Sequence, residues 1–275
     1  FPSVSAAWRI SEETFMRRTR SWLDNLKFRL SYGTLGNQYT SSLYPYMATI
    51  EPTTSIMPIG GSITSAMRQN SASNRYITWE TIKMTNLGLD MGLFNNKLNM
   101  SFDYFIKDTD DILLRVELPG VLGVTEPYQN AGKVRNKGWE LALSWKDKIG
   151  KNFTYGVDFN LSDVKNEVVS MGNTADDFSG DQIRAVGYPI DAFWGFQADG
   201  LYTVDDFDYD VNTGKYTPKK STPVIEELRT KVQPGDIKYR DLDGDGEITT
   251  KDDRTYIGSA IPRYTYSLGV NAAWK

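Results

Sequence analysis

One short segment of the sequence has the residue types and the spacing of a calcium-binding loop. Residues 241–252 read DLDGDGEITTKD, with carboxylates at positions 1, 3, 5 and 12 of the loop and a glycine at position 6. Calcium takes roughly six to eight oxygen ligands, and such a loop supplies them from these positions and from the backbone carbonyl at position 7. The predicted Ca²⁺ ligands are Asp241, Asp243, Asp245, Asp252 and the backbone carbonyl of Glu247.

This loop departs from the EF-hand pattern in two ways. Position 12 is Asp252 rather than the longer glutamate, and residues 237–239 read as a strand rather than as a helix. Without a helix pair to open, the loop is predicted to bind Ca²⁺ in a structural role rather than to sense it. The alternative is a solvated Asp/Gly turn without an ion, although crowded carboxylates repel one another when no cation is present.

Aromatic residues in the predicted loops could stack on sugar rings. Such stacking requires an aromatic face that is open to a ligand. The alternative, which we favour, is that these rings pack the loops together. The candidate substrate-binding residues are Tyr128, Phe193, Trp194 and Tyr202.

The composition argues against an enzyme. The 275 residues include no histidine and no cysteine, which removes the Ser-His-Asp triad, the usual zinc ligand sets and disulfides. A glycosidase needs one carboxyl group with a raised pKa to act as the general acid. The candidates Asp108, Asp110 and Asp111 lie in a predicted loop, where no surrounding residues would raise the pKa of a carboxyl group. The net charge of −4, without a basic stripe, gives no indication of nucleic-acid binding.

The elements that carry these loops are predicted from alternating apolar and polar residues. In residues 97–107, Leu98, Met100 and Phe102 point to one face, while Asn99 and Ser101 point to the other. Six further segments repeat this pattern. The seven predicted strands lie near residues 3–10, 26–33, 81–93, 97–107, 134–146, 153–163 and 263–275.

The lengths and faces of these strands favour a transmembrane barrel over a soluble sheet. Their polar faces carry Gly, Asp, Asn and Ser, which suit a water-filled interior better than a packed core. Strands of about 9–11 residues span a bilayer, and aromatic residues at their ends are typical of the two membrane interfaces. The alternative for those aromatics is an ordinary core. The predicted fold class is all-β, an antiparallel transmembrane β-barrel present here as an internal fragment.

The connections between the strands alternate between short and long. Residues 95–96 and 147–152 are short turns, whereas residues 34–81, 108–134 and 163–262 are long connections. Outer-membrane barrels have short periplasmic turns and long extracellular loops, so this alternation assigns the direction of each strand. Residues 164–262, with the calcium loop 241–252, are predicted to form a large extracellular region. A short helix is expected within residues 11–25.

Several stretches along the chain resemble one known family in order and spacing. They are FPSVSAAWRIS from Phe1, WLDNLKFRLSYGTLGNQ from Trp22, ITWE from Ile77, NAGKVRNKGWEL from Asn130, GYPIDAFWGFQADGLY from Gly187, PGDIKYRDLDGDGEIT from Pro234 and DDRTYIGSAIPRYTYSLGVN from Asp252. On these stretches the chain resembles the SusC/RagA family of TonB-dependent outer-membrane transporters.

The resemblance implies a barrel of about 22 strands with an N-terminal plug inside it. It also implies a SusD-like surface lipoprotein that acts as a lid, energy from TonB, and a location in the outer membrane of a Gram-negative member of the Bacteroidota. Substrates of the family are mostly glycans, with peptides in some members, and the transporters are expected to work in pairs. The plug and the residues that contact TonB are expected outside these 275 residues.

The sequence therefore predicts TonB-dependent import of a nutrient, a glycan or oligosaccharide in the first instance. Import of peptides by the same mechanism is one alternative. A passive porin-like channel and a secreted calcium-binding β-rich adhesion or sugar-binding module are two others.

Overall fold

The computed structural model describes residues 1–39, 44–48, 50–54, 65–69, 72–115, 119–172 and 174–274. The chain divides into two compact units. The sheet unit consists of Phe1–Asp176, Ala185–Ile190 and Ile261–Lys275, and the loop unit consists of Asp177–Arg184 and Asp191–Ala260.

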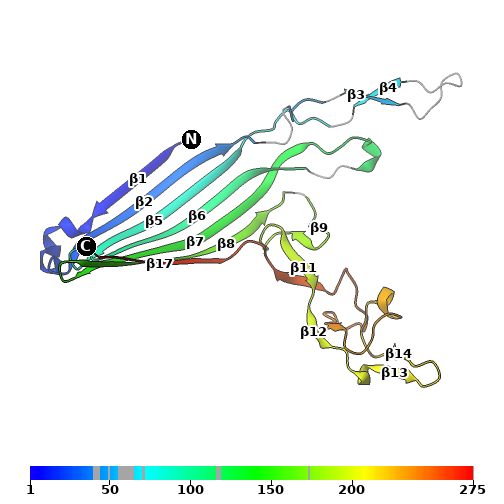
Figure 1. Cartoon of the computed structure of the whole chain (residues 1–275). Helices are drawn as coiled ribbons and strands as arrows, with labels where there is room; N and C mark the ends of the chain where they lie inside the picture. The colour runs from blue at the N-terminus through cyan, green and yellow to red at the C-terminus, as the bar shows by residue number, and fades with distance from the viewer. Residues whose placement is uncertain are drawn as a thin grey trace. The chain divides into compact units, whose positions relative to one another are not determined.

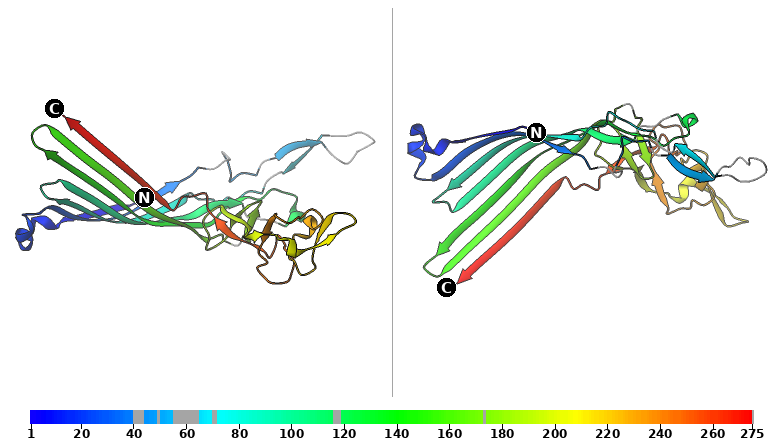
Figure 2. Two further views of the ribbon diagram at one scale, coloured as in Figure 1. Left: turned by 60° about the horizontal axis from the view of Figure 1, so that its bottom comes forward. Right: turned by 90° about the horizontal axis from the view of Figure 1, so that it is seen from above.

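Seven long antiparallel strands lie side by side in the sheet unit (Figure 1). Their order is β1-β2-β5-β6-β7-β8-β17, so neighbours in the sheet are also successive long strands of the chain. The strands are β1 Ser3–Arg9, β2 Leu23–Asn37, β5 Glu80–Leu93, β6 Leu98–Arg115, β7 Tyr128–Ile149, β8 Phe153–Ser170 and β17 Tyr264–Trp274. Figure 2 shows β1 and β17 at opposite edges of this sheet.

The strands begin and end differently from the sequence prediction at several points. β2, β6, β7 and β8 are all longer than predicted, and β8 continues to Ser170, inside the range that we assigned to the extracellular region. β17 matches its predicted range closely, and Lys275 lies outside the described residues. In place of one helix within residues 11–25 there are two 3₁₀ turns, η1 Ile10–Glu12 and η2 Thr14–Thr19. In the described part of the chain, no helix is long and apolar enough to span a membrane.

The register of the sheet separates two faces. Phe28, Leu89, Phe102, Leu141, Leu161 and Tyr266 are successive cross-strand partners from β2 to β17. The next row of cross-strand partners, shifted by one residue along each strand, consists of Arg29, Gly88, Asp103, Glu140, Ser162 and Thr265. Since successive side chains point to opposite faces, the sheet has one continuous apolar face and one continuous polar face.

The apolar face is open to its surroundings over much of its area. Phe28 is 41% exposed and Leu30 is 44% exposed, although both lie on β2, which has a neighbouring strand on each side. A soluble protein rarely leaves a contiguous apolar surface of this kind uncovered. The exposed apolar face is therefore the surface that a bilayer would cover.

The loop unit is built from short strands around a small core. β9 Asp177–Ser179, β10 Gln182–Arg184, β11 Ala192–Phe196 and β16 Arg254–Gly258 form one sheet, while β12 Ala198–Leu201 pairs with β15 Ile237–Tyr239 and β13 Phe207–Asp210 pairs with β14 Lys215–Pro218. Turns η4 Val204–Asp206 and η5 Glu226–Leu228 connect these strands. Tyr202, Phe207 and Val224 form the buried core, with Val232 packed against it.

Two smaller elements complete the sheet unit. β3 Ile50–Thr54 pairs with β4 Ser65–Gln69 as a separate hairpin within the connection between β2 and β5. Turn η3 Gly120–Leu122 lies in the connection between β6 and β7. These elements lie at the end of the sheet where the connections are long.

Substitution of arginine at the centre of the apolar face tests the assignment of that face to lipid. Val157 pairs with Trp145 and Val270 in the middle of the apolar rows. Val157→Arg is expected to destabilise the full-length protein in lipid vesicles by about 2–4 kcal/mol, the cost of a basic side chain near the bilayer midplane. Urea unfolding measures this difference.

The matched control is Asn160→Arg, on the polar face of the same strand between Ala142 and Ser267. This substitution is expected to change stability little, because the long side chain can extend into water. Equal losses from the two substitutions would contradict the assignment of the faces.

Candidate functional site

The polar face of the sheet carries a charge cluster centred on Arg29. Its guanidinium donates from Nε and Nη2 to the Asp90 carboxylate, at 2.9 and 3.0 Å, and from Nη2 to Oδ2 of Asp103 at 2.9 Å. Ser101 Oγ donates to Oδ1 of Asp90 at 3.1 Å. β2, β5 and β6 each contribute to this cluster, so it fixes the orientation of polar side chains across three strands.

Gly88 provides the space for this cluster. It lies between Arg29 and Asp103 in the register, and a Cβ added there would come within 2.5 Å of Cζ of Arg29. A side chain at this position would push the guanidinium away from its two carboxylates. Sequence reasoning placed these residues on one face but missed the cluster, which becomes visible only once the strands are aligned in register.

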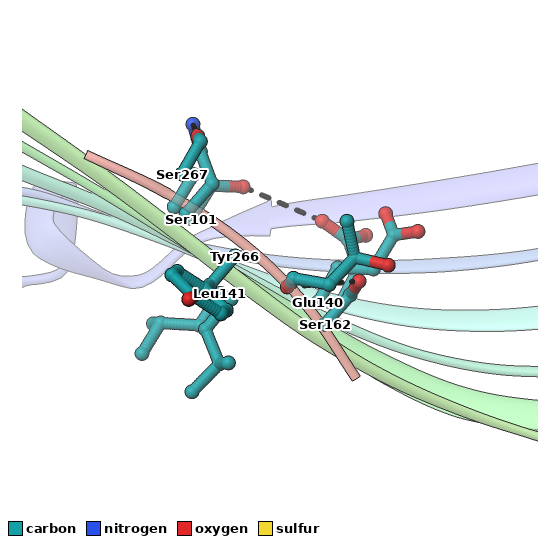
Figure 3. Close-up of a pocket in the computed structure, with 11 residues that line it drawn as sticks. Ser101, Glu140, Leu141, Ser162, Tyr266 and Ser267 are labelled. Atoms are coloured by element: carbon teal, nitrogen blue, oxygen red, sulfur yellow. Dashed lines mark hydrogen bonds between the residues drawn. The ribbon is translucent and has the colours of Figure 1, made fainter. Parts of the chain in front are cut away.

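Beside the cluster, the polar face forms a shallow hollow of about 320 Å³. Figure 3 shows Leu141 and Tyr266 projecting to the opposite side of the sheet from Ser267. Asn160 Nδ2 donates to Ser267 Oγ at 3.0 Å, and Oδ1 of Asp103 is buried without a hydrogen-bond partner among the described residues. The polar lining consists of Ser101, Asp103, Glu140, Asn160, Ser162, Thr265 and Ser267. Hydroxyl, amide and carboxylate groups at this density can exchange hydrogen bonds with a polar solute.

The acidic loop lies in the loop unit, between β15 and β16. Gly244 and Gly246 have φ values of 79° and 91°, which the chain needs for the sharp turns of the loop. Carboxylate oxygens of Asp241, Asp243 and Asp253 lie within 4.8 Å of one another. These three carboxylates form the group in the described residues that could share one cation.

The electrostatics of this loop reflect the crowding. The backbone N–H of Gly246 donates to Asp241 at 2.8 Å and, with the N–H of Gly244 at 2.6 Å, lowers the pKa of that carboxyl. For Asp243, the N–H of Asp245 favours the charged form. Burial and the negative charges of Asp245 and Asp253 outweigh it, so the pKa of Asp243 is raised. A carboxylate that is disfavoured by neighbouring carboxylates is one that a cation would stabilise.

The structure differs from the predicted ligand set at the end of the loop. Asp253, rather than Asp252, joins Asp241 and Asp243, and it is only 1% exposed. It accepts hydrogen bonds from the backbone N–H groups of Leu242 and Thr249, each at 2.7 Å. Asp252 is exposed, and its N–H donates to Oγ1 of Thr249.

The two other predicted ligands also lie outside this group. The carboxylate of Asp245 accepts the N–H of Glu247 at 2.8 Å, which caps a turn within the loop. Asp245, the carbonyl of Glu247 and Asp252 therefore stay predictions as Ca²⁺ ligands. The spacing of the EF-hand pattern pointed to Asp252, and nothing in the adjacent Asp252-Asp253 pair showed which of the two carboxylates turns inward.

Comparison with known proteins decides the family. The model of the family described as TonB dependent receptor-like, beta-barrel, matches residues 1–275, the whole chain. The chain belongs to this family. The prediction of an all-β transmembrane barrel fold is therefore confirmed, and the open seven-stranded sheet is part of such a barrel wall. The family consists of outer-membrane transporters rather than enzymes.

Two curated proteins are similar to this member of the TonB-dependent receptor family over most or all of its length. TonB-dependent receptor P3 of Formosa agariphila is 30% identical over 285 residues, which covers 100% of this chain and 27% of the relative. TonB-dependent receptor SusC of Bacteroides thetaiotaomicron is 29% identical over 214 residues, 72% of this chain and 21% of the relative. The chain thus spans about a quarter of the length of the curated relatives that it matches.

A solved structure shows the same fold. The structure described as the RagAB peptide transporter superposes with a TM-score of 0.71 and 24% identity, over 99% of this chain and 27% of the matched chain. The likeness to SusC and to a RagAB chain agrees with the family resemblance that the sequence motifs indicated.

The predicted substrate-binding aromatics of this TonB-dependent receptor chain have different environments. Tyr202 is 4% exposed and donates its hydroxyl to the carbonyl of Pro223 at 2.7 Å. It packs edge-to-face on Phe207, with ring centroids 5.9 Å apart. Tyr202 is therefore a core residue of the loop unit with little open ring surface, and as a substrate contact it stays a prediction.

The other three aromatics are not buried. Phe193 and Trp194 lie on β11, where the register shifts between them, and Trp194 packs edge-to-face against Phe178 at 5.9 Å. Tyr128 begins β7 in the sheet unit, where the guanidinium of Arg115 lies 5.1 Å from its ring centroid. Phe193 is 37% exposed and is the most exposed of the three. All three residues stay predictions as substrate contacts.

Removal of the buried carboxylate at the end of the acidic loop tests its structural role. Asp253→Ala leaves the N–H groups of Leu242 and Thr249 without their acceptor, at a cost of about 1–3 kcal/mol per group. In the full-length transporter with chelator present, limited proteolysis between residues 234 and 260 is expected to become faster. Asp252→Ala, the exposed neighbour, serves as the control, and equally fast cleavage in both variants would argue against the assignment.

Proposed function

We propose that this chain forms part of the wall and of the extracellular region of a transporter that imports a glycan or oligosaccharide across the outer membrane, driven by TonB. The observation that carries the proposal is the family match over all 275 residues, together with a sheet that has one apolar and one polar face. The polar face lines the path of the solute, and the apolar face contacts lipid. Parts of the protein outside this chain supply the plug and the contact with TonB.

A SusD-like surface lipoprotein is the proposed partner of the extracellular region. The likeness to SusC and to a chain of the RagAB transporter supports this assignment. The loop unit, with its own core and short sheets, is rigid enough to offer a defined surface to such a lid. We also propose that the organism belongs to the Bacteroidota and that two importers assemble as a pair.

Peptide import by the same mechanism is the second candidate. The description of RagAB as a peptide transporter favours it for that relative. The hollow beside the Arg29 cluster is lined by hydroxyl, amide and carboxylate groups, which suit the hydroxyl groups of a sugar as well as a peptide backbone. A passive channel and a secreted module are less well supported, because the family match points to energised transport and the exposed apolar face points to lipid.

The uptake proposal is tested in the organism that carries the complete gene. A strain that lacks the gene is expected to lose growth on one class of oligosaccharide as the sole nutrient and to keep growth on the free monosaccharide. Growth on that oligosaccharide should also require TonB. Loss of growth on peptides alone would instead assign peptide import, and uptake that persists without TonB would indicate a passive channel.

We further propose that the acidic loop binds one Ca²⁺ and stiffens residues 234–261. The three carboxylates of Asp241, Asp243 and Asp253 and the raised pKa of Asp243 support a cation at this position. Ca²⁺ fits better than Mg²⁺, because it tolerates irregular sets of oxygen ligands while Mg²⁺ holds its waters in a tight octahedron. The role is structural, since no helix pair flanks the loop.

Chelation is expected to expose this segment to protease in the full-length transporter. Excess Ca²⁺ should restore protection, and the same concentration of Mg²⁺ should not. Asp241→Asn combined with Asp243→Asn keeps the size of both side chains but removes two charges, so this variant should be cleaved at the chelated rate with or without Ca²⁺. Identical cleavage of the unmodified protein in chelator and in Ca²⁺ would reduce the loop to an acidic turn.

A further inference from the structure

Charged side chains follow directly after the apolar rows on the outward, lipid-facing side of the sheet. On β6, the apolar residues that end at Ile106 are succeeded on the same face by Asp108 and Asp110. On β7, Trp139 is succeeded by Lys137 and then by Arg135. This change lies at the end of the sheet with the long connections, which is the extracellular end under the proposed function.

These charges form a belt across β5, β6, β7 and β8, which we call the rim belt. Lys83 and Lys133 both pair with Asp110, at 2.8 and 2.9 Å, and Arg135 pairs with Asp108 at 2.7 Å. Further along, Lys165 pairs with Glu167 at 2.9 Å. The rim belt consists of the basic residues Lys83, Lys133, Arg135, Lys137 and Lys165 and the acidic residues Asp108, Asp110, Asp163 and Glu167, with Asp163 held by Arg263 from directly before β17. Basic groups outnumber acidic ones, so the belt has an excess of positive charge.

The excess is concentrated at one pair of lysines. Lys137 and Lys165 are direct cross-strand partners in the register of β7 and β8 and therefore point to the same face. Like charges directly opposite each other on one face of a sheet destabilise it. Both side chains are exposed, and Lys137 makes no ion pair within the part of the chain that the structure describes. Glu167, two residues from Lys165 on the same face, offsets part of this repulsion, and an anion held between the two ammonium groups would offset the rest.

The position of the pair identifies the source of the anion. Trp139 lies two residues from Lys137 on the same face, and its ring stacks on Phe102 with centroids 6.2 Å apart. An aromatic residue at the top of an apolar band, followed by basic residues, is the arrangement expected at the level of lipid headgroups. A solute on the transport path would meet the polar face instead, so lipid is the occupant that this face can reach.

We propose that Lys137 and Lys165 bind a phosphate group of an outer-leaflet glycolipid, with the acyl chains of that lipid lying along the apolar rows below Trp139. Two ammonium groups on one face supply the donors that a phosphate oxygen requires. Glu167 pairs with Lys165 from the side, while Lys137 makes no ion pair with the described residues, so its side chain can turn toward the headgroup. The inference rests on the outward assignment of the apolar face and not on the identity of the imported solute.

Native mass spectrometry of the full-length transporter in mild detergent tests the proposal, with diphosphorylated lipid A and its dephosphorylated form as probes. The unmodified protein is expected to retain the phosphorylated lipid in preference to the dephosphorylated one. Lys137→Gln combined with Lys165→Gln should weaken retention of the phosphorylated lipid by about fivefold or more, since each basic group near an anionic lipid surface contributes roughly that factor.

Two further variants separate lipid binding from stability. Lys146→Gln combined with Lys148→Gln removes the same charge from exposed positions at the other end of β7 and should leave retention unchanged. Lys137→Glu places opposite charges across the strands, so it should raise the urea midpoint while it abolishes lipid retention. Equal retention of both lipid forms by the unmodified protein, or undiminished retention by the double glutamine variant at Lys137 and Lys165, would overturn the proposal.

Discussion

Lipid offers no hydrogen-bond partner to a peptide backbone, and this constraint organises the sheet unit. Each backbone N–H and C=O at membrane depth must be paired within the protein, so strands can cross only when both of their edges have neighbours. The long continuous register between β5, β6, β7 and β8 meets that demand without a gap through the apolar rows. Irregularities of the register appear beyond those rows, between Thr109 and Leu113 on β6 and at Lys133 on β7, where water can satisfy the backbone.

The same pairing forces charges onto the inner wall in fixed rows. The apolar residues of β2 and β6 face lipid, so the residues that alternate with them along each strand face inward. Arg29 and Asp103 are two of these inward residues, and the register places them at the same level of the sheet. Their ion pair is partly exposed to solvent, and such pairs contribute little to stability on their own. What the cluster provides is orientation, because a bidentate guanidinium between two carboxylates keeps three polar side chains in one arrangement.

Sequence reasoning located the seven long strands and their two faces, because contact with lipid on one face requires apolar and polar residues to alternate with a period of two. It underestimated the lengths of β7 and β8 because beyond the bilayer the outward residues become polar, so alternation no longer marks the strand. The burial of Tyr202 could not be predicted from the sequence, because it depends on contacts with Phe207 and Val224 that no local pattern indicates. The inward turn of Asp253 likewise depends on the folded path of the loop, which brings the backbone N–H groups of Leu242 and Thr249 to its carboxylate.

The conflict between Lys137 and Lys165 follows from the same constraint that builds the sheet. A slip of one residue between β7 and β8 would separate the two lysines, but it would also turn every apolar side chain of β8 toward the interior. A slip of two residues would keep the faces but would break the alignment of Leu141 with Leu161 along the whole band. The register is thus held by the apolar face and by the cross-strand apolar pairs together, and it cannot relax to relieve one repulsive pair at the rim. Where the fold cannot move to remove a repulsion between cations, anions lower its energy: Glu167 does so from within the sheet, and a bound phosphate would add to its effect.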